Sequence, residues 1–135
     1  FNFYKKRYKK IKKKLNIVID ENNLYVSDNI GFLYALNLKN NEIVWAKNYK
    51  KPFRSNLKIN KNRLITSNQN NDLLIFNKAN GEIIKLIPTE ETAVKSEFIN
   101  NISTNKDTVF YINTFGSLYS IDFSTIGFHP CFILY

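Results

Sequence analysis

Hydrophobic and polar positions alternate in short runs, separated by turn residues, along most of the chain. Residues 15–20 (LNIVID) form the first apolar run, and within residues 42–48 Ile43 and Trp45 fall on one side of an extended chain. These runs are rich in Ile, Val, Tyr and Phe, which favour β-strands. No segment has the i, i+3, i+4 apolar spacing of a long amphipathic helix. The pattern therefore predicts an all-β protein built from short strands.

The runs recur as a longer unit. Residues 62–85 (NRLITSNQNNDLLIFNKANGEIIK) align without a gap on residues 22–45 (NNLYVSDNIGFLYALNLKNNEIVW), at an offset of 40. A third copy, residues 108–122 (TVFYINTFGSLYSID), aligns on the first at an offset of 85. Strand-rich units with a period of about 40 to 45 residues are typical of β-propeller blades. The expected fold is an all-β β-propeller fragment of consecutive four-stranded antiparallel blades, about two and a half in number.

Each copy predicts its own set of strands. The expected strands are residues 15–20, 24–27, 32–38 and 42–48 in the first copy, 57–60, 64–67, 73–77 and 82–87 in the second, and 98–103, 108–112 and 117–122 in the third. Asn80 and Gly81 predict a tight hairpin, because both residue types tolerate positive φ. We expect four leucines to be buried between the sheets, namely Leu33, Leu36, Leu73 and Leu118.

The repeat also divides the chain into segments. Residues 1–14 are interpreted as the end of a preceding blade and a basic interblade connection, and residues 15–122 as the blades (15–48, 56–87 and 98–122). Residues 123–135 depart from the pattern and are interpreted as a truncated tail. Closed propellers contain about four to eight blades, so the chain is expected to be a piece of a larger protein.

The positive charge is local. The formal net charge is +9, and eight of the twenty basic residues lie in the first fourteen positions: Lys5, Lys6, Arg7, Lys9, Lys10, Lys12, Lys13 and Lys14. This segment fits a solvated connection between blades, a surface for anionic lipid or an acidic partner, or a phosphate-binding stripe on which Tyr4 and Tyr8 stack against bases. The Asn-, Lys- and Ile-rich composition favours the solvated connection, and no nucleic-acid partner is expected.

Few residues carry reactive chemistry. The chain has one histidine, His129, and one cysteine, Cys131, both in the off-pattern tail. They provide neither a metal-binding cluster nor a disulfide framework. Glu90 and Glu91 are paired carboxylates in a predicted loop, and adjacent acids in a loop are usually solvated charges rather than an acid–base pair. We therefore expect no catalytic, cofactor-binding or metal-binding residues, and no enzymatic activity.

The repeat unit resembles a known family. Residues 31–45 (GFLYALNLKNNEIVW) and 116–122 (GSLYSID) are similar to the quinoprotein-type propeller repeat, Gly-x-Leu-Tyr-Ala-Leu-Asp-x-x-x-Gly-x-x-x-Trp. Asn37 replaces the usual Asp, and Asn41 replaces the turn Gly that Gly81 supplies in the second copy. The resemblance implies that Trp45 docks between neighbouring blades.

Within that family the chain resembles the propeller lipoproteins of the outer-membrane β-barrel assembly machinery of Gram-negative bacteria. Phe53, Arg54 and Ser55 match a hydrophobic-Arg-small pattern that this family uses against its partner subunit. Glu97 matches the first of two acids in the next connection, whereas Ile99 occupies the second position. The resemblance implies a cofactor-free periplasmic scaffold that is anchored to the outer membrane by an N-terminal lipid. Its partner would be the periplasmic domains of a barrel-assembly subunit.

The expected contact surface is one rim of the blades. In a meander, loops alternate between the two ends of the sheet, so the connections 49–55 and 88–95 should share a rim with the loops 28–31, 68–71 and 113–116. We expect Phe53 and Arg54 to be exposed there. Two other functions remain open: a fragment of a quinone-dependent dehydrogenase whose catalytic residues lie in other blades, and a cytoplasmic propeller scaffold.

Overall fold

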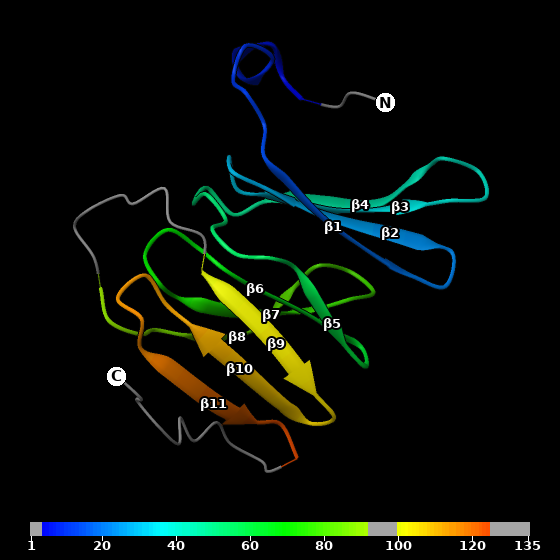
Figure 1. The fold of residues 1–135 in the computed structure, drawn as a ribbon. Helices are drawn as coiled ribbons and strands as arrows, with labels where there is room; N and C mark the ends of the chain where they lie inside the picture. Colours follow the sequence, from blue (N-terminus) through cyan, green and yellow to red (C-terminus); the bar gives the residue numbers. More distant parts are fainter. Residues whose placement is uncertain (1–3, 92–99, 125–135) are drawn as a thin grey trace.

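The computed structural model describes residues 4–91 and 100–124, which form 11 strands in three antiparallel sheets (Figure 1). Blade 1 contains β1 (Leu15–Asp20), β2 (Asn23–Asp28), β3 (Phe32–Asn37) and β4 (Ile43–Asn48). Blade 2 contains β5 (Lys58–Asn60), β6 (Arg63–Ser67), β7 (Leu73–Asn77) and β8 (Ile83–Ile87), and blade 3 contains β9 (Asn101–Asn105), β10 (Thr108–Ile112) and β11 (Leu118–Asp122). Strands follow chain order within each sheet, which confirms the predicted propeller fragment.

The first strands of the three blades lie side by side. β1 contacts β5, and β5 contacts β9. Ser55 and Asn100, each shortly before the first strand of its blade, form a parallel bridge. The backbone N–H of Asn100 donates to the Arg54 carbonyl at 2.7 Å. The sheets therefore fan out from a shared line of inner strands, with β4 and β8 at the outer edge (Figure 1).

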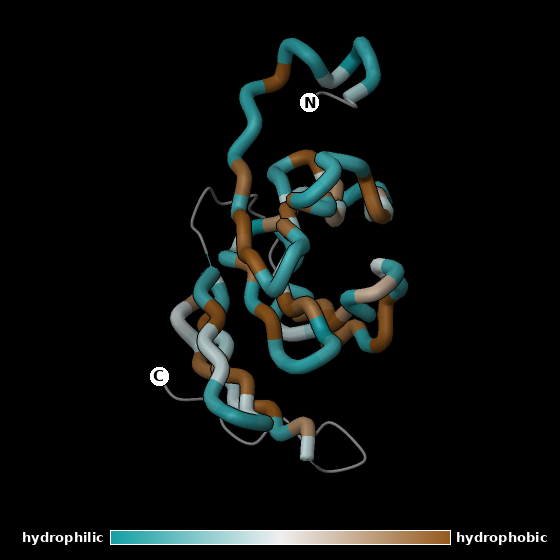
Figure 2. The backbone as a smooth tube through the Cα atoms, turned by 90° about the vertical axis from the view of Figure 1, so that its right-hand side faces the viewer, coloured by the Kyte–Doolittle hydropathy of each residue, from teal (hydrophilic) through white to brown (hydrophobic). Residues whose placement is uncertain are grey.

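Two hydrophobic clusters join the blades, and hydrophobic residues recur along the strands of all three (Figure 2). The cluster between blades 1 and 2 contains Tyr25, Leu33, Ala35, Phe53, Leu57, Leu64, Leu74 and Phe76. The cluster between blades 2 and 3 contains Ile65, Leu73, Ile75, Ile87, Ile102, Val109, Tyr111, Tyr119 and Ile121. Because side chains alternate across a strand, one face of β6 and β7 serves each cluster.

The third strand of each blade ends on a polar residue that binds the backbone of the turn after it. The Oδ1 atoms of Asn37, Asn77 and Asp122 each accept the backbone N–H two residues later at 2.8 Å. Asn37 and Asn77 therefore accept the same turn hydrogen bond as Asp122, the residue type of the family pattern. Asn41, at φ 59°, also adopts the left-handed conformation that Gly81 adopts at φ 75°.

The structure corrects two expectations. Leu33 and Leu73 are fully buried, but Leu36 and Leu118 are only half-buried. Leu36 pairs with Leu24 on the side of blade 1 that points away from blade 2, and Leu118 pairs with Ile112 on the side of blade 3 that points away from blade 2. The first strand of the third copy ends later than predicted, at Asn105 rather than at residue 103, and residues 98 and 99 of that prediction lie outside the described residues.

The basic N-terminal segment folds against blade 1. It contains a single 3-10 turn, η1 (Lys6–Tyr8). The rings of Tyr4 and Tyr8 pack edge-on against Phe32, at 5.4 and 5.6 Å between centroids. The Tyr4 hydroxyl also donates to Asp28 Oδ2 at 2.5 Å. Both tyrosines are therefore engaged within the protein, which disfavours the base-stacking interpretation.

Candidate partner-binding site

The interblade connections lie beside the loops between second and third strands, as expected for one rim. The N–H of Phe53 donates to the Asp28 carbonyl at 3.2 Å, and the N–H of Gln69 donates to the Pro52 carbonyl at 2.9 Å. At the next blade, the Thr89 hydroxyl donates to the Asn71 carbonyl at 2.5 Å. We call the loops 28–31, 68–71 and 113–116, with the connections 49–55 and 88–91, the connection rim.

A repeated residue that the sequence comparison did not single out shapes this rim. Asp28 Oδ1 accepts the N–H groups of Ile30, Gly31 and Phe32 at 2.8 to 2.9 Å. Asn68 and Asn113, at offsets of 40 and 85, accept loop N–H groups in the same way. The signal was present in the alignment as a column of Asp or Asn, the residue types that hydrogen-bond their own loop backbone.

Phe53 is buried, so the expectation that it is an exposed contact residue is wrong. Only 3% of its surface is exposed, and its ring packs against Tyr49 and Phe76 at centroid distances of 6.0 and 6.2 Å. The segment around Phe53 runs antiparallel to Asn68, in a bridge that turns the ring into the space between blades 1 and 2. A large aromatic ring gains more from that apolar space than from water.

Arg54 points away from the aromatic cluster and is half-buried. Its backbone N–H donates to the Ser67 carbonyl at 2.8 Å, which fixes the start of the side chain. The Nε atom is buried and has no hydrogen-bond partner among the described residues. A buried guanidinium N–H without an acceptor is costly, so an acidic group at this position would be stabilising. Glu97, the third predicted contact residue, lies outside the described residues.

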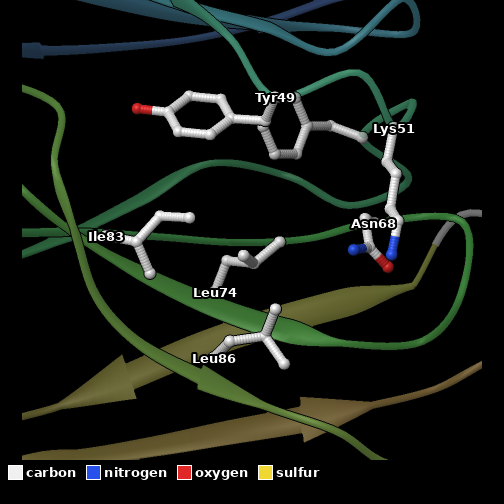
Figure 3. A pocket seen from close by; sticks show the side chains of 7 residues that line it. Tyr49, Lys51, Asn68, Leu74, Ile83 and Leu86 are labelled. Carbon is white, nitrogen blue, oxygen red and sulfur yellow. The ribbon is translucent and has the colours of Figure 1, made fainter.

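A pocket of about 120 Å³ opens between the connection 49–53 and the outer half of blade 2 (Figure 3). Tyr49 lies across the pocket from Leu74 and Leu86, with Ile83 at one end and Lys51 and Asn68 at the other (Figure 3). The residues that line it are Tyr49, Lys51, Phe53, Asn68, Leu74, Ile83 and Leu86. Ile83 and Leu86 are 48% and 43% exposed, so the mouth of the pocket is apolar and open to solvent.

The pocket wall is held in place by Tyr49. Its hydroxyl donates to the Gly81 carbonyl, and its ring lies 4.8 Å from that of Phe76. Burial, with a contribution from the negative charge of Glu82, raises the pKa of Tyr49 to about 12. The phenol therefore stays neutral at physiological pH and acts as a hydrogen-bond donor rather than as a base. Among the described residues that line the pocket, Lys51 is the one cation, at one end.

Glu90, the first of the paired carboxylates, is held by two side chains of blade 3. Glu90 Oε2 accepts the Asn113 amide at 3.0 Å and the Ser117 hydroxyl at 2.7 Å. These two hydrogen bonds lower the pKa of Glu90 below its usual value. Among residues 4–91 and 100–124, no group of three or more His, Cys, Asp or Glu side chains is placed to hold a metal ion. His129 and Cys131 lie outside that part of the chain.

Comparison with known proteins defines the class by fold. No protein-family model matches the sequence, and a search of curated proteins gives no match. Among solved structures, BamB from Moraxella catarrhalis superposes with a TM-score of 0.68 at 11% identity, over 87% of this chain and 38% of BamB. The chain thus spans less than half the length of that protein. No helix in the described residues is long and apolar enough to cross a bilayer.

Proteins of other functions share the architecture. The quinohemoprotein alcohol dehydrogenase from Comamonas testosteroni gives a TM-score of 0.67 at 13% identity, over 84% of this chain and 20% of the enzyme. The C-terminal WD40 domain of Sif2 gives 0.64 at 14% identity, over 86% of this chain and 33% of the other. These similarities establish a β-propeller fold, which hosts many functions.

Proposed function

We propose that the chain is part of a non-enzymatic β-propeller scaffold that binds a protein partner at the connection rim. The pocket beside Tyr49 is the observation that carries this proposal. It offers an open apolar mouth at Ile83 and Leu86, with Lys51 at one end. An extended partner segment with one apolar side chain and a nearby carboxylate fits that combination. Aromatic and aliphatic walls supply the affinity, and the cation fixes the orientation.

Arg54 supplies a second anchor on the same rim. The side chain is half-buried, so its exposed part can meet a partner carboxylate although the Nε atom itself is buried. Arginine is favoured in such a role, because its planar guanidinium can make paired hydrogen bonds to a carboxylate. Phe53 lines the pocket from its buried side, so we expect it to shape the pocket rather than to contact the partner at the surface.

We further propose that the partner is a barrel-assembly subunit and that the protein acts in the periplasm as an accessory of outer-membrane protein assembly. This rests on the resemblance of residues 31–45 and 53–55 to the barrel-assembly lipoproteins. The similarity of fold to BamB is consistent with it. Attachment to the outer membrane through an N-terminal lipid belongs to the same proposal.

The binding proposal is tested with Leu86→Asp and Lys51→Glu in a pulldown with the periplasmic domains of a barrel-assembly subunit. Each substitution places a negative charge at the pocket, and each should weaken binding by about 1 to 3 kcal/mol. Leu38→Asp is the matched control, because Leu38 is 44% exposed and lies at the opposite rim, after β3. Equal binding by all three variants would refute the pocket as the contact site.

Absence of enzymatic activity is a separate part of the proposal. Quinone-dependent dehydrogenases hold a quinone and a Ca²⁺ ion, and the described residues do not provide a carboxylate cluster for that ion. We expect the protein to show no substrate-dependent dye reduction with alcohols or sugars after incubation with quinone and Ca²⁺. Measurable electron transfer under those conditions would instead support the dehydrogenase alternative.

A further inference from the structure

Strand β8 forms the outer edge of blade 2, and no described strand covers that edge. β8 pairs with β7 on one side only. Residues 83–86 are all exposed, and Ile83, Ile84 and Leu86 keep 43 to 50% of their surface. Blades 1 and 3 pack on the two faces of blade 2, so they leave this outer edge open. An exposed apolar edge is a template for pairing with another strand.

The backbone of Leu86 points out of this edge. In an antiparallel sheet, residue pairs that exchange hydrogen bonds alternate with pairs that do not. In blade 1 the Tyr49 N–H donates to the Gly31 carbonyl at 2.8 Å, which fixes this alternation. The third pair from there is a non-bonded pair, and at an offset of 40 it corresponds to Leu74 and Leu86. The N–H and C=O groups of Leu86 are therefore directed away from β7.

The side chain of Leu86 lies on the pocket side of the same strand. It lines the pocket together with Leu74 and Ile83 (Figure 3). Residues directly opposite each other on paired strands project their side chains to the same face of the sheet. A residue that bonds to the Leu86 backbone from an added strand therefore directs its own side chain over the pocket. The edge and the pocket thus form one site for an extended chain.

Lys51 gives this site a direction. Ile83 and Lys51 lie at opposite ends of the pocket, with Leu86 between them (Figure 3). Side chains two residues apart on a strand share a face and lie about 7 Å from each other. A strand that runs antiparallel to β8 passes Lys51 before it reaches Leu86. A carboxylate that pairs with Lys51 therefore comes two residues before the apolar residue.

We propose that the partner adds a strand antiparallel to β8, with an apolar residue opposite Leu86 and an Asp or Glu two residues before it. This inference rests on the proposed function, because it names the way in which a protein partner occupies the pocket. In strand addition, main-chain hydrogen bonds supply affinity and side-chain pockets supply specificity. The recognised element is an acid-x-apolar sequence in an extended conformation.

The corresponding edge of blade 1 is less suited to this sequence. At an offset of 40, β4 carries Ala46 where β8 carries Leu86. A methyl group offers much less apolar surface than an isobutyl group to the side chain opposite it. Both strands are exposed outer edges, so β4 serves as an internal control for edge pairing without the apolar wall.

Binding of N-methylated peptides to the 135-residue chain tests the proposal. The probe is the end-blocked, labelled peptide Thr-Val-Glu-Thr-Leu-Thr-Val, and fluorescence anisotropy gives its dissociation constant. A methyl group on the Leu nitrogen removes the N–H that donates to the Leu86 carbonyl, so binding should weaken about tenfold or more. A methyl group on the preceding Thr nitrogen is the matched control. That N–H points away from β8, so the affinity should be unchanged.

Two variants and a second peptide locate the added strand. Leu86→Asp should abolish binding, whereas Ala46→Asp, at the matched exposed position of β4, should bind the peptide as the wild type does. The peptide with the reversed order, Thr-Val-Leu-Thr-Glu-Thr-Val, places its carboxylate at the Ile83 end. It should bind about two- to fivefold more weakly, because it loses the ion pair with Lys51.

Absence of binding by the unmodified peptide would overturn the proposal. So would equal affinities of the two methylated peptides, or an equal loss of binding in the two variants. If methylation has no effect but Leu86→Asp still abolishes binding, the pocket remains the proposed contact site and the added strand is refuted. The peptide measurements do not involve the barrel-assembly subunit, so the methylation pattern supports strand addition whether or not that subunit binds in the pulldown.

Discussion

At the scale of single residues, Trp45 shows how one side chain holds two blades together. Its indole N–H donates to the Lys78 carbonyl of blade 2 at 3.1 Å, which confirms the expected position between blades. The ring lies directly against Gly81, where an added Cβ would come within 2.5 Å of the Trp45 Cζ3 atom. The glycine of the second copy therefore serves both its own turn and the docking of the preceding blade.

Gly81→Ala should destabilise the fold at this contact. The substitution places a Cβ against an aromatic ring and an L side chain at φ +75°. Overpacking typically costs about 1 to 3 kcal/mol, and the left-handed backbone adds about 1 to 2 kcal/mol. The free energy of unfolding in urea measures the sum.

Gly116→Ala separates the two costs. Gly116 has φ +81°, but a Cβ there would have nothing within 4 Å. Only the backbone cost of about 1 to 2 kcal/mol should remain. Equal losses of stability in the two variants would contradict the steric role of Trp45.

Phe53→Ala tests the burial of the connection. Removing a ring that is 97% buried from an aromatic cluster should lower the free energy of unfolding by about 3 to 5 kcal/mol. Phe115, which is 56% exposed, provides the control, and Phe115→Ala should change stability by less than about 0.5 kcal/mol. Chemical denaturation of both variants makes the comparison. A change below about 1 kcal/mol for Phe53→Ala would contradict a stabilising role for this ring in the aromatic cluster.

At the scale of elements, side-chain hydrogen bonds fix the blade 3 end of the connection rim. The loop 113–117 is closed by Asn113 Oδ1 and tied to the connection 88–91 through Glu90. Asn100 joins the same region, because its amide donates to Asn71 Oδ1 and to the Tyr111 hydroxyl, each at 3.0 Å. The rim therefore depends on ionisable and polar groups at its blade 3 end.

The stability of that loop should depend on pH through Glu90. Since its hydrogen bonds lower the pKa of Glu90 in the folded state, the unfolded chain takes up its proton first as the pH falls. The stabilisation is thus present above the ordinary glutamate pKa and is lost as the pH drops through the folded-state pKa. Thermal midpoints between about pH 7 and pH 3 should fall less in Glu90→Gln than in the wild type. Parallel curves would contradict this assignment.

At the scale of the whole molecule, the two interblade interfaces differ in chemistry. Trp45, Tyr49, Phe53 and Phe76 make the first largely aromatic. The second combines aliphatic residues with a buried hydroxyl, since the Tyr111 side chain has no exposed surface. Its hydroxyl accepts from Asn100, and burial raises the pKa of Tyr111 far above that of a free tyrosine. Arrays of repeats that contact only their neighbours derive stability from such interfaces separately.

Tyr111→Phe should weaken the second interface selectively. The change removes the hydroxyl that accepts from the Asn100 amide and donates to the Asn71 carbonyl, and each such hydrogen bond contributes about 0.5 to 1.5 kcal/mol. Trp45 is the only tryptophan and reports on the first interface. The urea midpoint followed by circular dichroism should therefore fall by more than the midpoint followed by Trp45 fluorescence. Identical shifts would show that the three blades unfold as one unit.

The sequence by itself determined the order of the strands and the positions of the turns. The repeat places a turn residue such as Asn37 or Asn77 at the same step of each copy, and a two-residue alternation leaves little freedom for the strands between turns. For the same reason Trp45 could be assigned to an interblade position from its place in the repeat. Strands and turns depend on residues that are close in the sequence, so the local sequence is sufficient to predict them.

Only the tertiary structure decided which of the matched positions are covered. Phe53 lies in a connection without periodicity, and its burial depends on Tyr49 and Phe76, which come from other elements. Leu33 and Leu118 occupy the same column, yet one is buried and the other half-exposed, because blade 2 covers the first and no described blade covers the second. The burial of a side chain depends on which blade packs against it, and the sequence of one repeat does not contain that information.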